Sequence, residues 1–265
     1  MNKLRFFRND HFGTMFTCLV LSLLFFLGKG LSQEKSVDQI VKEIDELYRS
    51  DSSFARLEMQ IVTSHWERTL KMKAWSEGMK KTLIRITSPA KEEGVATLRI
   101  ENEMWNYLPK TNKVIKVPPS MMMSSWMGSD FTNNDLVREF TFLEDYNYEK
   151  TSIEDGEKNL IYIRFTPKEG RPIVWGYIIA AVQKEDYLPV WEKYYDEKGK
   201  LMRVLYFKDI QTFDGRRIPS IMELVPQNEE GNKTIIQYLE IDFNPQISED
   251  VFSLRNLRSQ GSGEI

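Results

Sequence analysis

Cysteine is almost absent from this chain of 265 residues, since Cys18 is the only one. It lies inside the apolar run of residues 15–27 and not just after it, which is the wrong place for the lipid-modified cysteine of a bacterial lipoprotein. If that run is removed, no thiol remains for a disulfide, a catalytic nucleophile or a metal site. The rest of the chain must therefore rely on its apolar core.

Histidine is scarce too, and only His65 of the two histidines lies outside the N-terminal segment. A Ser-His-Asp site would have to use His65, and no nucleophile elbow accompanies it. The chain also lacks a glycine-rich phosphate loop and a pair of carboxylates in an apolar setting. We therefore expect no enzyme, no cofactor and no metal, which leaves binding as the default activity.

Runs of basic residues are missing as well. The formal net charge is −3, and loss of the N-terminal segment, which is rich in lysine and arginine, leaves the remainder more acidic. This balance argues against nucleic acid and against anionic membrane surfaces as partners.

The N-terminus has the layout of a secretory signal. Lys3, Arg5 and Arg8 precede the apolar run of residues 15–27, and small residues at Gly30 and Ser32 favour cleavage before residue 33. The run is shorter than the ~20 residues that span a bilayer, which disfavours the alternative of a retained membrane anchor. We expect residues 1–32 to be a cleaved signal peptide and the protein to be periplasmic.

A helix is expected directly after this segment. Ser36 and Gln39 have the spacing of a capping box, in which each side chain satisfies a free backbone donor of the other residue. Apolar residues then recur at three- and four-residue intervals and form one stripe: Val37, Ile40, Val41, Ile44, Leu47 and Tyr48.

From Phe54 onward the apolar period changes to two, which is typical of strands separated by short turns. About a dozen such segments follow one another without βαβ alternation, and no linker interrupts them. The sequence predicts a mainly β protein. A single strongly curved antiparallel sheet forms an incomplete, half-open barrel, with the N-terminal helix and a mid-chain helical lid over its concave face. We place this domain at residues 33–257 and a disordered tail at residues 258–265.

The mid-chain segment of residues 118–140 differs from the strands around it. Four methionines and a tryptophan fall within seven residues: Met121, Met122, Met123, Trp126 and Met127. Methionine is flexible and suits surfaces that adapt to variable apolar shapes, so the segment could be a lid over an apolar cavity. The alternative is a short core helix whose methionines fill gaps.

The polar residues that follow do not have the spacing of a calcium loop. Helix capping explains them better, with Asn133 or Asn134 at the start of a short turn and Asp135 near its positive end.

Residues 125–136, which read SWMGSDFTNNDL, resemble a signature of the outer-membrane lipoprotein-sorting protein family, the LolA-like group, in its branch with a Met-Gly-Ser-Asp-Phe-Thr motif. Segments 105–109, 113–116, 188–190, 195–199, 215–219 and 247–252 resemble family segments in the same order. The resemblance covers nearly the whole chain after the signal.

This resemblance implies a periplasmic carrier whose cavity accepts the acyl chains of lipids or lipoproteins, exchanged with an inner-membrane transporter or exporter. A monomer is expected. The alternative is a lipid-sensing or accessory module on the same fold that works with a membrane protein. The residues expected to line the cavity and lid are Trp105, Tyr107, Met121, Met122, Met123, Trp126, Met127, Phe131 and Leu136.

Overall fold

The computed structural model describes residues 34–137, 141–171 and 173–259, except for the side chains of residues 136 and 137. The predicted signal peptide therefore lies outside the described residues, as do residues 260–265 of the predicted tail, whereas Arg258 at its start belongs to a short helix. The chain divides into two units, Met1–Lys35 and Ser36–Ile265, and the fold is that of the second. Within the described ranges, no helix combines the length and the apolar character needed to cross a bilayer.

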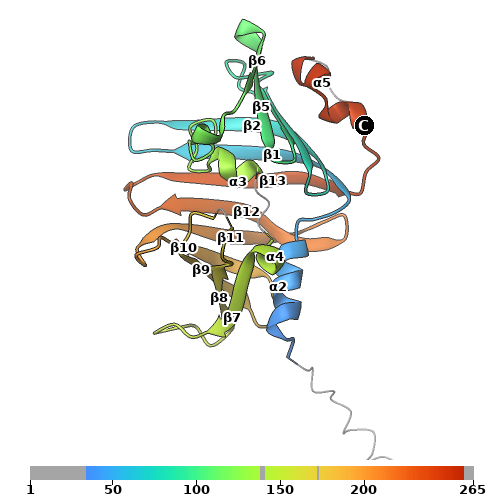
Figure 1. Cartoon of the computed structure of the whole chain (residues 1–265). Coiled ribbons are helices and arrows are strands. Elements are labelled where there is room, and N and C mark those ends of the chain that lie inside the picture. The colour runs from blue at the N-terminus through green and yellow to red at the C-terminus, as the bar shows by residue number, and fades with distance from the viewer. Residues whose placement is uncertain (1–33, 138–140, 172, 260–265) are drawn as a thin grey trace, which may run out of the picture. The chain divides into compact units, whose positions relative to one another are not determined.

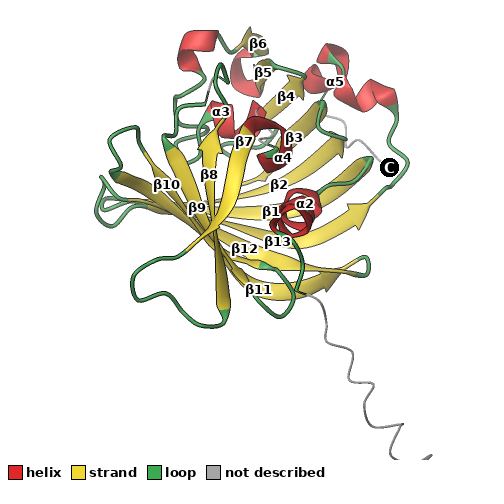
Figure 2. Cartoon of the chain, turned by 60° about the horizontal axis from the view of Figure 1, so that its bottom comes forward, coloured by secondary structure: helices red, strands yellow, loops and turns green. Residues whose placement is uncertain are grey.

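Thirteen antiparallel strands form one sheet that curves without closing, as the period-two pattern predicts (Figures 1 and 2). Their order is β6-β5-β4-β3-β2-β1-β13-β12-β11-β10-β9-β8-β7. The bounds are β1 Ser52–Val62, β2 Glu67–Glu77, β3 Lys81–Ser88, β4 Ala96–Ile100, β5 Glu103–Leu108, β6 Lys113–Lys116, β7 Tyr146–Thr151, β8 Leu160–Pro167, β9 Tyr177–Gln183, β10 Pro189–Tyr195, β11 Leu201–Phe213, β12 Arg216–Pro226 and β13 Lys233–Phe243.

The central seam of the sheet joins its first strand to its last. β1 pairs with β13 from Ser53 opposite Phe243 to Val62 opposite Lys233. A bulge leaves Leu239 without a partner, because Arg56 pairs with Glu240 and Leu57 with Tyr238. An extra residue shifts the alternation of side chains, so β13 presents apolar residues to one face on both sides of the bulge.

We call this face, which carries helices α2 and α4, the inner face of the sheet. Helix α2, Val37–Glu46, begins at the predicted capping box of Ser36 and Gln39. Its Asp45 carboxylate accepts hydrogen bonds from the backbone N of Phe142 (3.0 Å) and Leu143 (3.3 Å) in helix α4, Phe142–Asp145. Both helices pack on inward-facing residues of β7 to β10 (Figure 2).

The C-terminal segment covers part of the opposite, outer face. It consists of the short 3₁₀ turn η3, Glu249–Phe252, and helix α5, Leu254–Arg258 (Figure 1). Phe252 and Leu257 pack against Trp75, Leu98 and Tyr107 of β2, β4 and β5. This end of the sheet is therefore buried on both faces.

We predict that Phe252→Ala lowers the free energy of unfolding by about 3 kcal/mol, because a buried aromatic side chain would leave a cavity. Urea denaturation measures the change. The control is Leu254→Ala in the same segment, whose side chain is 43% exposed and whose loss should cost under about 1 kcal/mol. Equal effects of the two substitutions would contradict a stabilising role for the packing of Phe252 on the outer face.

Candidate functional site

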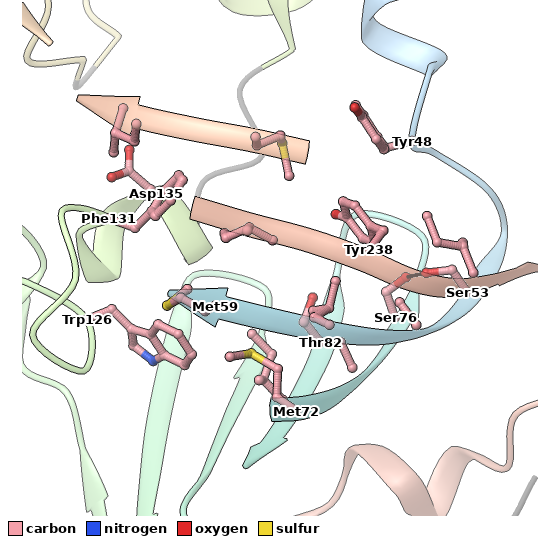
Figure 3. A pocket seen from close by; sticks show the side chains of 18 of the residues that line it. Tyr48, Ser53, Met59, Met72, Ser76, Thr82, Trp126, Phe131, Asp135 and Tyr238 are labelled. Carbon is pink, nitrogen blue, oxygen red and sulfur yellow. Dashed lines mark hydrogen bonds between the residues drawn. The ribbon is translucent and has the colours of Figure 1, made fainter. Parts of the chain in front are cut away.

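A cavity of about 420 Å³ lies on the inner face of the sheet, and we call it the central cavity (Figure 3). Pockets that take small ligands typically measure about 300–1,000 Å³. Its walls come from both halves of the sheet and from the segment between β6 and α4, residues 117–141, which we call the insert. The lining residues are Tyr48, Ser53, Ala55, Leu57, Met59, Met72, Ala74, Trp75, Ser76, Thr82, Ile84, Trp126, Phe131, Asp135, Tyr194, Arg203, Leu205, Met222, Leu224, Ile236, Tyr238, Ile241 and Phe243.

The alternation of side chains along the strands explains this lining. Every second residue of β1 from Ser53 to Met59 points into the cavity. On the neighbouring strand β2, Ala74 lies opposite Ala55 and Met72 lies opposite Leu57. Two alanines side by side leave space that larger residues would fill, while the methionine beside them can adapt its shape.

The polar groups at the Ser53 end of the cavity satisfy one another. The hydroxyls of Ser53 and Ser76 are 2.6 Å apart, and the hydroxyl of Tyr48 donates to the carbonyl of Pro219 at 2.8 Å. In Figure 3, Ser53, Ser76 and Thr82 lie at one end, and Trp126, Phe131 and Asp135 lie at the other. The middle of the cavity offers mainly carbon and sulfur, which suits an apolar chain.

The insert is fixed to both halves of the sheet. Trp126 Nε1 donates to Thr97 Oγ1 of β4 at 3.1 Å, and Arg68 of β2 donates to the carbonyl of Met127. On the other side, the backbone N of Asp130 donates to Thr234 Oγ1 of β13 at 2.9 Å. These contacts make the insert a roof that bridges the two halves.

A buried ion pair also holds the insert to β11. The Arg203 guanidinium donates to both carboxylate oxygens of Asp135, at 2.8 and 2.9 Å, and it lies 4.5 Å from the ring centre of Trp175 and 4.4 Å from that of Tyr194. Burial alone would raise the pKa of Asp135, but the hydrogen bonds and charge of Arg203 hold that pKa below its ordinary value. Asp135 is therefore a carboxylate at neutral pH.

The short helix α3, Asn133–Val137, begins differently from the sequence-based expectation. Thr132 caps it: the backbone N of Asp135 donates to Thr132 Oγ1 at 3.1 Å, and the backbone N of Thr132 donates to Asp135 Oδ2 at 2.8 Å. The expectation of a cap at Asn133 or Asn134 was wrong, because Asn133 instead donates from Nδ2 to the carbonyl of Met121 at 3.0 Å.

Glu192 extends the polar network beneath Arg203. Tyr194 donates its hydroxyl to Glu192 Oε2 at 2.5 Å. Burial raises the pKa of Glu192 to about 7, although Tyr194 and Arg203 favour its ionised form. This carboxyl group is hidden in the core and does not line the central cavity.

Two of the predicted binding residues line the central cavity, namely Trp126 and Phe131. Met122 and Met127 pack against the same core cluster as Trp126, beside the cavity. Met121 and Met123 are 50% and 48% exposed, because successive residues of the tight turn after Pro119 point in different directions.

The structure does not bring the remaining predicted residues to the central cavity. Trp105 and Tyr107 pack on the outer face against the C-terminal segment, whereas Met104, directly before Trp105, packs with Trp126 on the inner face. Leu136 belongs to α3, but its side chain lies outside the described part.

Sequence reasoning missed most of the residues that line the central cavity. Met59, Met72 and Met222 lie on strands whose apolar alternation also fits an ordinary packed core. Arg203 and Asp135 are 68 positions apart in sequence, and no local pattern announces their pairing.

Comparisons with known proteins agree with this architecture. A family model described only as an uncharacterised protein matches residues 78–259. No curated protein matches the chain.

Three solved structures are similar to the chain. A DUF1329 family protein from Desulfovibrio piger shares 23% identity with a TM-score of 0.74 over 83% of this chain and 96% of its own. A domain from Vibrio parahaemolyticus that carries the name of an outer membrane lipoprotein-sorting protein is 21% identical in sequence, with a TM-score of 0.71. The match covers 83% of this chain and 97% of that domain. A LolA superfamily protein from Nitrosomonas europaea is 19% identical in sequence, with a TM-score of 0.67. The match covers 84% of this chain and 99% of that protein. The predicted LolA-like fold is confirmed.

We predict that Asp135→Asn lowers the free energy of unfolding by about 3 kcal/mol, because it leaves the buried charge of Arg203 without its partner. Chemical denaturation measures the loss. The control is Glu240→Gln, which breaks the exposed pair of Glu240 with Arg56 and should cost no more than about 1 kcal/mol. If Asp135→Asn lowered the free energy of unfolding no more than Glu240→Gln, the buried ion pair of Asp135 with Arg203 would not stabilise the fold as proposed.

The raised pKa of Glu192 predicts a pH dependence of stability. Between the ordinary carboxyl pKa and about 7, the folded protein holds a proton that the unfolded chain has released, so stability falls as pH rises through this window. The slope attributable to Glu192 is about −1 kcal/mol per pH unit. Unfolding measured from pH 5 to pH 7 in wild type and Glu192→Gln should differ by this slope, and parallel curves would refute the assignment.

Proposed function

The chain belongs to the family of uncharacterised proteins whose model matches residues 78–259, and from this premise we propose that it is a periplasmic carrier of acylated molecules. The acyl chain of a lipid or lipoprotein occupies the central cavity, and the insert forms its roof. The LolA-like fold and the sequence resemblance of residues 125–136 support this assignment.

One observation carries the proposal: the inner face of the sheet leaves an apolar cavity of about 420 Å³ that its own side chains do not fill. Roughly ten methylene groups buried there would contribute about 8 kcal/mol. Association costs at least about 4 kcal/mol, so the net binding free energy is at most about 4 kcal/mol and the chain is not trapped. A carrier needs this balance, because it must also release its cargo.

The insert is the element that would admit and release the chain. Its hold on the C-terminal half of the sheet depends on a few polar contacts, chiefly Asp135 with Arg203 and Asp130 with Thr234. These contacts can part and re-form without disturbing the strand ladder. Exchange with an inner-membrane transporter or exporter would then occur at the insert.

The cellular location follows from the N-terminal segment. The predicted signal peptide of residues 1–32 would deliver the domain to the periplasm, where a carrier can move acylated molecules between two membranes. Binding without turnover is the activity proposed, since the described residues that line the central cavity include no nucleophile with an adjacent base.

Filling the cavity tests the carrier function. We predict that Ala74→Leu weakens binding of a fluorescent fatty-acid probe at least about tenfold, because the added side chain takes the space of the ligand. Thermal stability should stay within about 1.5 kcal/mol of wild type, since a void absorbs the new atoms. Probe titration and thermal unfolding provide the two measurements.

The matched control is Ala90→Leu, the same enlargement at an exposed position in a turn, which should leave binding unchanged. Mass spectrometry of gently purified native protein should reveal bound lipid in wild type and not in Ala74→Leu. A wild-type protein that carries no lipid and binds no probe would refute the carrier function.

A further inference from the structure

A second cavity of about 540 Å³ adjoins the central one, and we call it the outer pocket. It is lined by Ile61, Thr63, Met123, Ser125, Gly128, Ser129, Asp130, Thr132, Trp175, Met202, Arg203, Pro226, Asn228, Glu229 and Asn232. Arg203 lines both cavities, and different residues of the insert face each of them. The insert therefore lies between a mainly apolar cavity and a pocket of mixed lining that carries two carboxylates.

The charges of the outer pocket favour a cation. Asp130 and Glu229 place two carboxylates there, and Arg203 is the only basic residue among the described lining. Arg203 is already paired with Asp135. Asp130 accepts a hydrogen bond from Thr234 Oγ1 at 2.7 Å and Glu229 accepts one from Asn232, but in the described ranges neither carboxylate has a basic partner.

The charge of Glu229 acts on Asp130. Burial raises the pKa of Asp130, and the nearby charge of Glu229 raises it further. An ammonium group between them would remove this repulsion. Glu229 is exposed and Asp130 is half-buried, so the site is open to a ligand from the solvent side.

At the boundary of the two cavities, one donor is unused. Arg203 Nε is buried and has no hydrogen-bond partner among the described residues, although its other two nitrogens bind Asp135. A buried donor without a partner costs about 1–3 kcal/mol. The atom is covered in this arrangement, so a ligand oxygen at the junction of an acyl chain and a head group would satisfy it once the insert moves to admit the ligand.

We propose that the outer pocket binds the amine-bearing head group of an acylated lipid whose chain occupies the central cavity. The order of groups in the ligand matches the order in the protein. The acyl chain lies against Met59 and Met72, the junction phosphate or ester oxygen accepts from Arg203, and the ammonium group lies between Asp130 and Glu229. This inference rests on the proposed carrier function and names the class of cargo.

Displacement of the fatty-acid probe by lauroyl lipids that differ only in the head group tests the proposal. Lauroyl lysophosphatidylethanolamine carries the ammonium group, and lauroyl lysophosphatidylglycerol lacks it. We expect the ethanolamine lipid to bind about tenfold more tightly, because a hydrogen bond to a charged group contributes roughly the free energy that corresponds to a tenfold change in affinity. Equal affinities would overturn the ammonium site.

Substitutions in the outer pocket locate the preference. Asp130→Asn combined with Glu229→Gln should bring the ratio of the two affinities close to one, and exposed Glu229→Gln alone should lower it to about threefold. Glu230→Gln, a matched loss of charge at the next residue, should keep the full ratio because Glu230 does not line the pocket. A ratio that survives Glu229→Gln, or that falls equally in Glu230→Gln, would overturn the assignment.

Two further ligands separate the remaining outcomes. Dodecylamine has the chain and the ammonium group but no junction oxygen, so it should bind more weakly than the ethanolamine lipid, and equal binding would remove Arg203 from the site. Monolaurin has the chain with an uncharged head group. If neither monolaurin nor any lysolipid displaces the probe, the carrier function itself fails, whereas displacement by monolaurin with no preference for the amine defeats only the head-group site.

Discussion

The connection between β6 and β7 constrains the whole structure. These two strands are neighbours in sequence order, yet they form the two opposite edges of the sheet, because β1 pairs with β13 at its centre. The chain must therefore travel from one edge to the other. In a curved sheet the short way runs across the inner face, so the described residues between Lys116 and Tyr146 lie over that face for reasons of topology, whatever their composition.

A roofed concavity need not be hollow, and here the side chains decide. Ala55 and Ala74 face each other on adjacent strands where larger residues would fill the space. The part of the inner face formed by β7 to β9 is closed by α2 and α4, whose side chains pack with Phe165 and its neighbours. One sheet thus combines a packed region, which supplies stability, with an open region, which supplies the cavity.

Local sequence patterns predict where the helices and strands of this fold lie better than they predict what packs against them. The capping box at Ser36 and the period-two strands were visible in sequence, because they depend on neighbouring residues. The sequence did not show which residues of β5 face inward, because Met104 and Tyr107 are both apolar and each face of that strand is covered. What distinguishes them is the C-terminal segment, which packs on the outer face from about 150 residues away along the chain.

The candidate site divides along the same line. That Trp126 and Phe131 line the cavity could be predicted, because large aromatic side chains in a polar loop are usually buried against another part of the fold. The Asp135 and Arg203 pair could not, because it joins the insert to a strand that follows it at long range.

The methionines have a different role from the one their clustering suggests. Those of the insert lie beside the central cavity or in solvent, while Met59, Met72 and Met222, scattered over three strands, form its walls. A strand fixes the backbone of each side chain, so only the flexible thioether moves when a chain of different shape enters. Adaptability therefore belongs to the sheet, and the insert contributes the polar contacts that, under the proposed function, would hold the cavity closed. An apolar cavity distinguishes poorly among acyl chains, so in a carrier of the proposed kind selectivity would have to come from the charged residues on the far side of the insert.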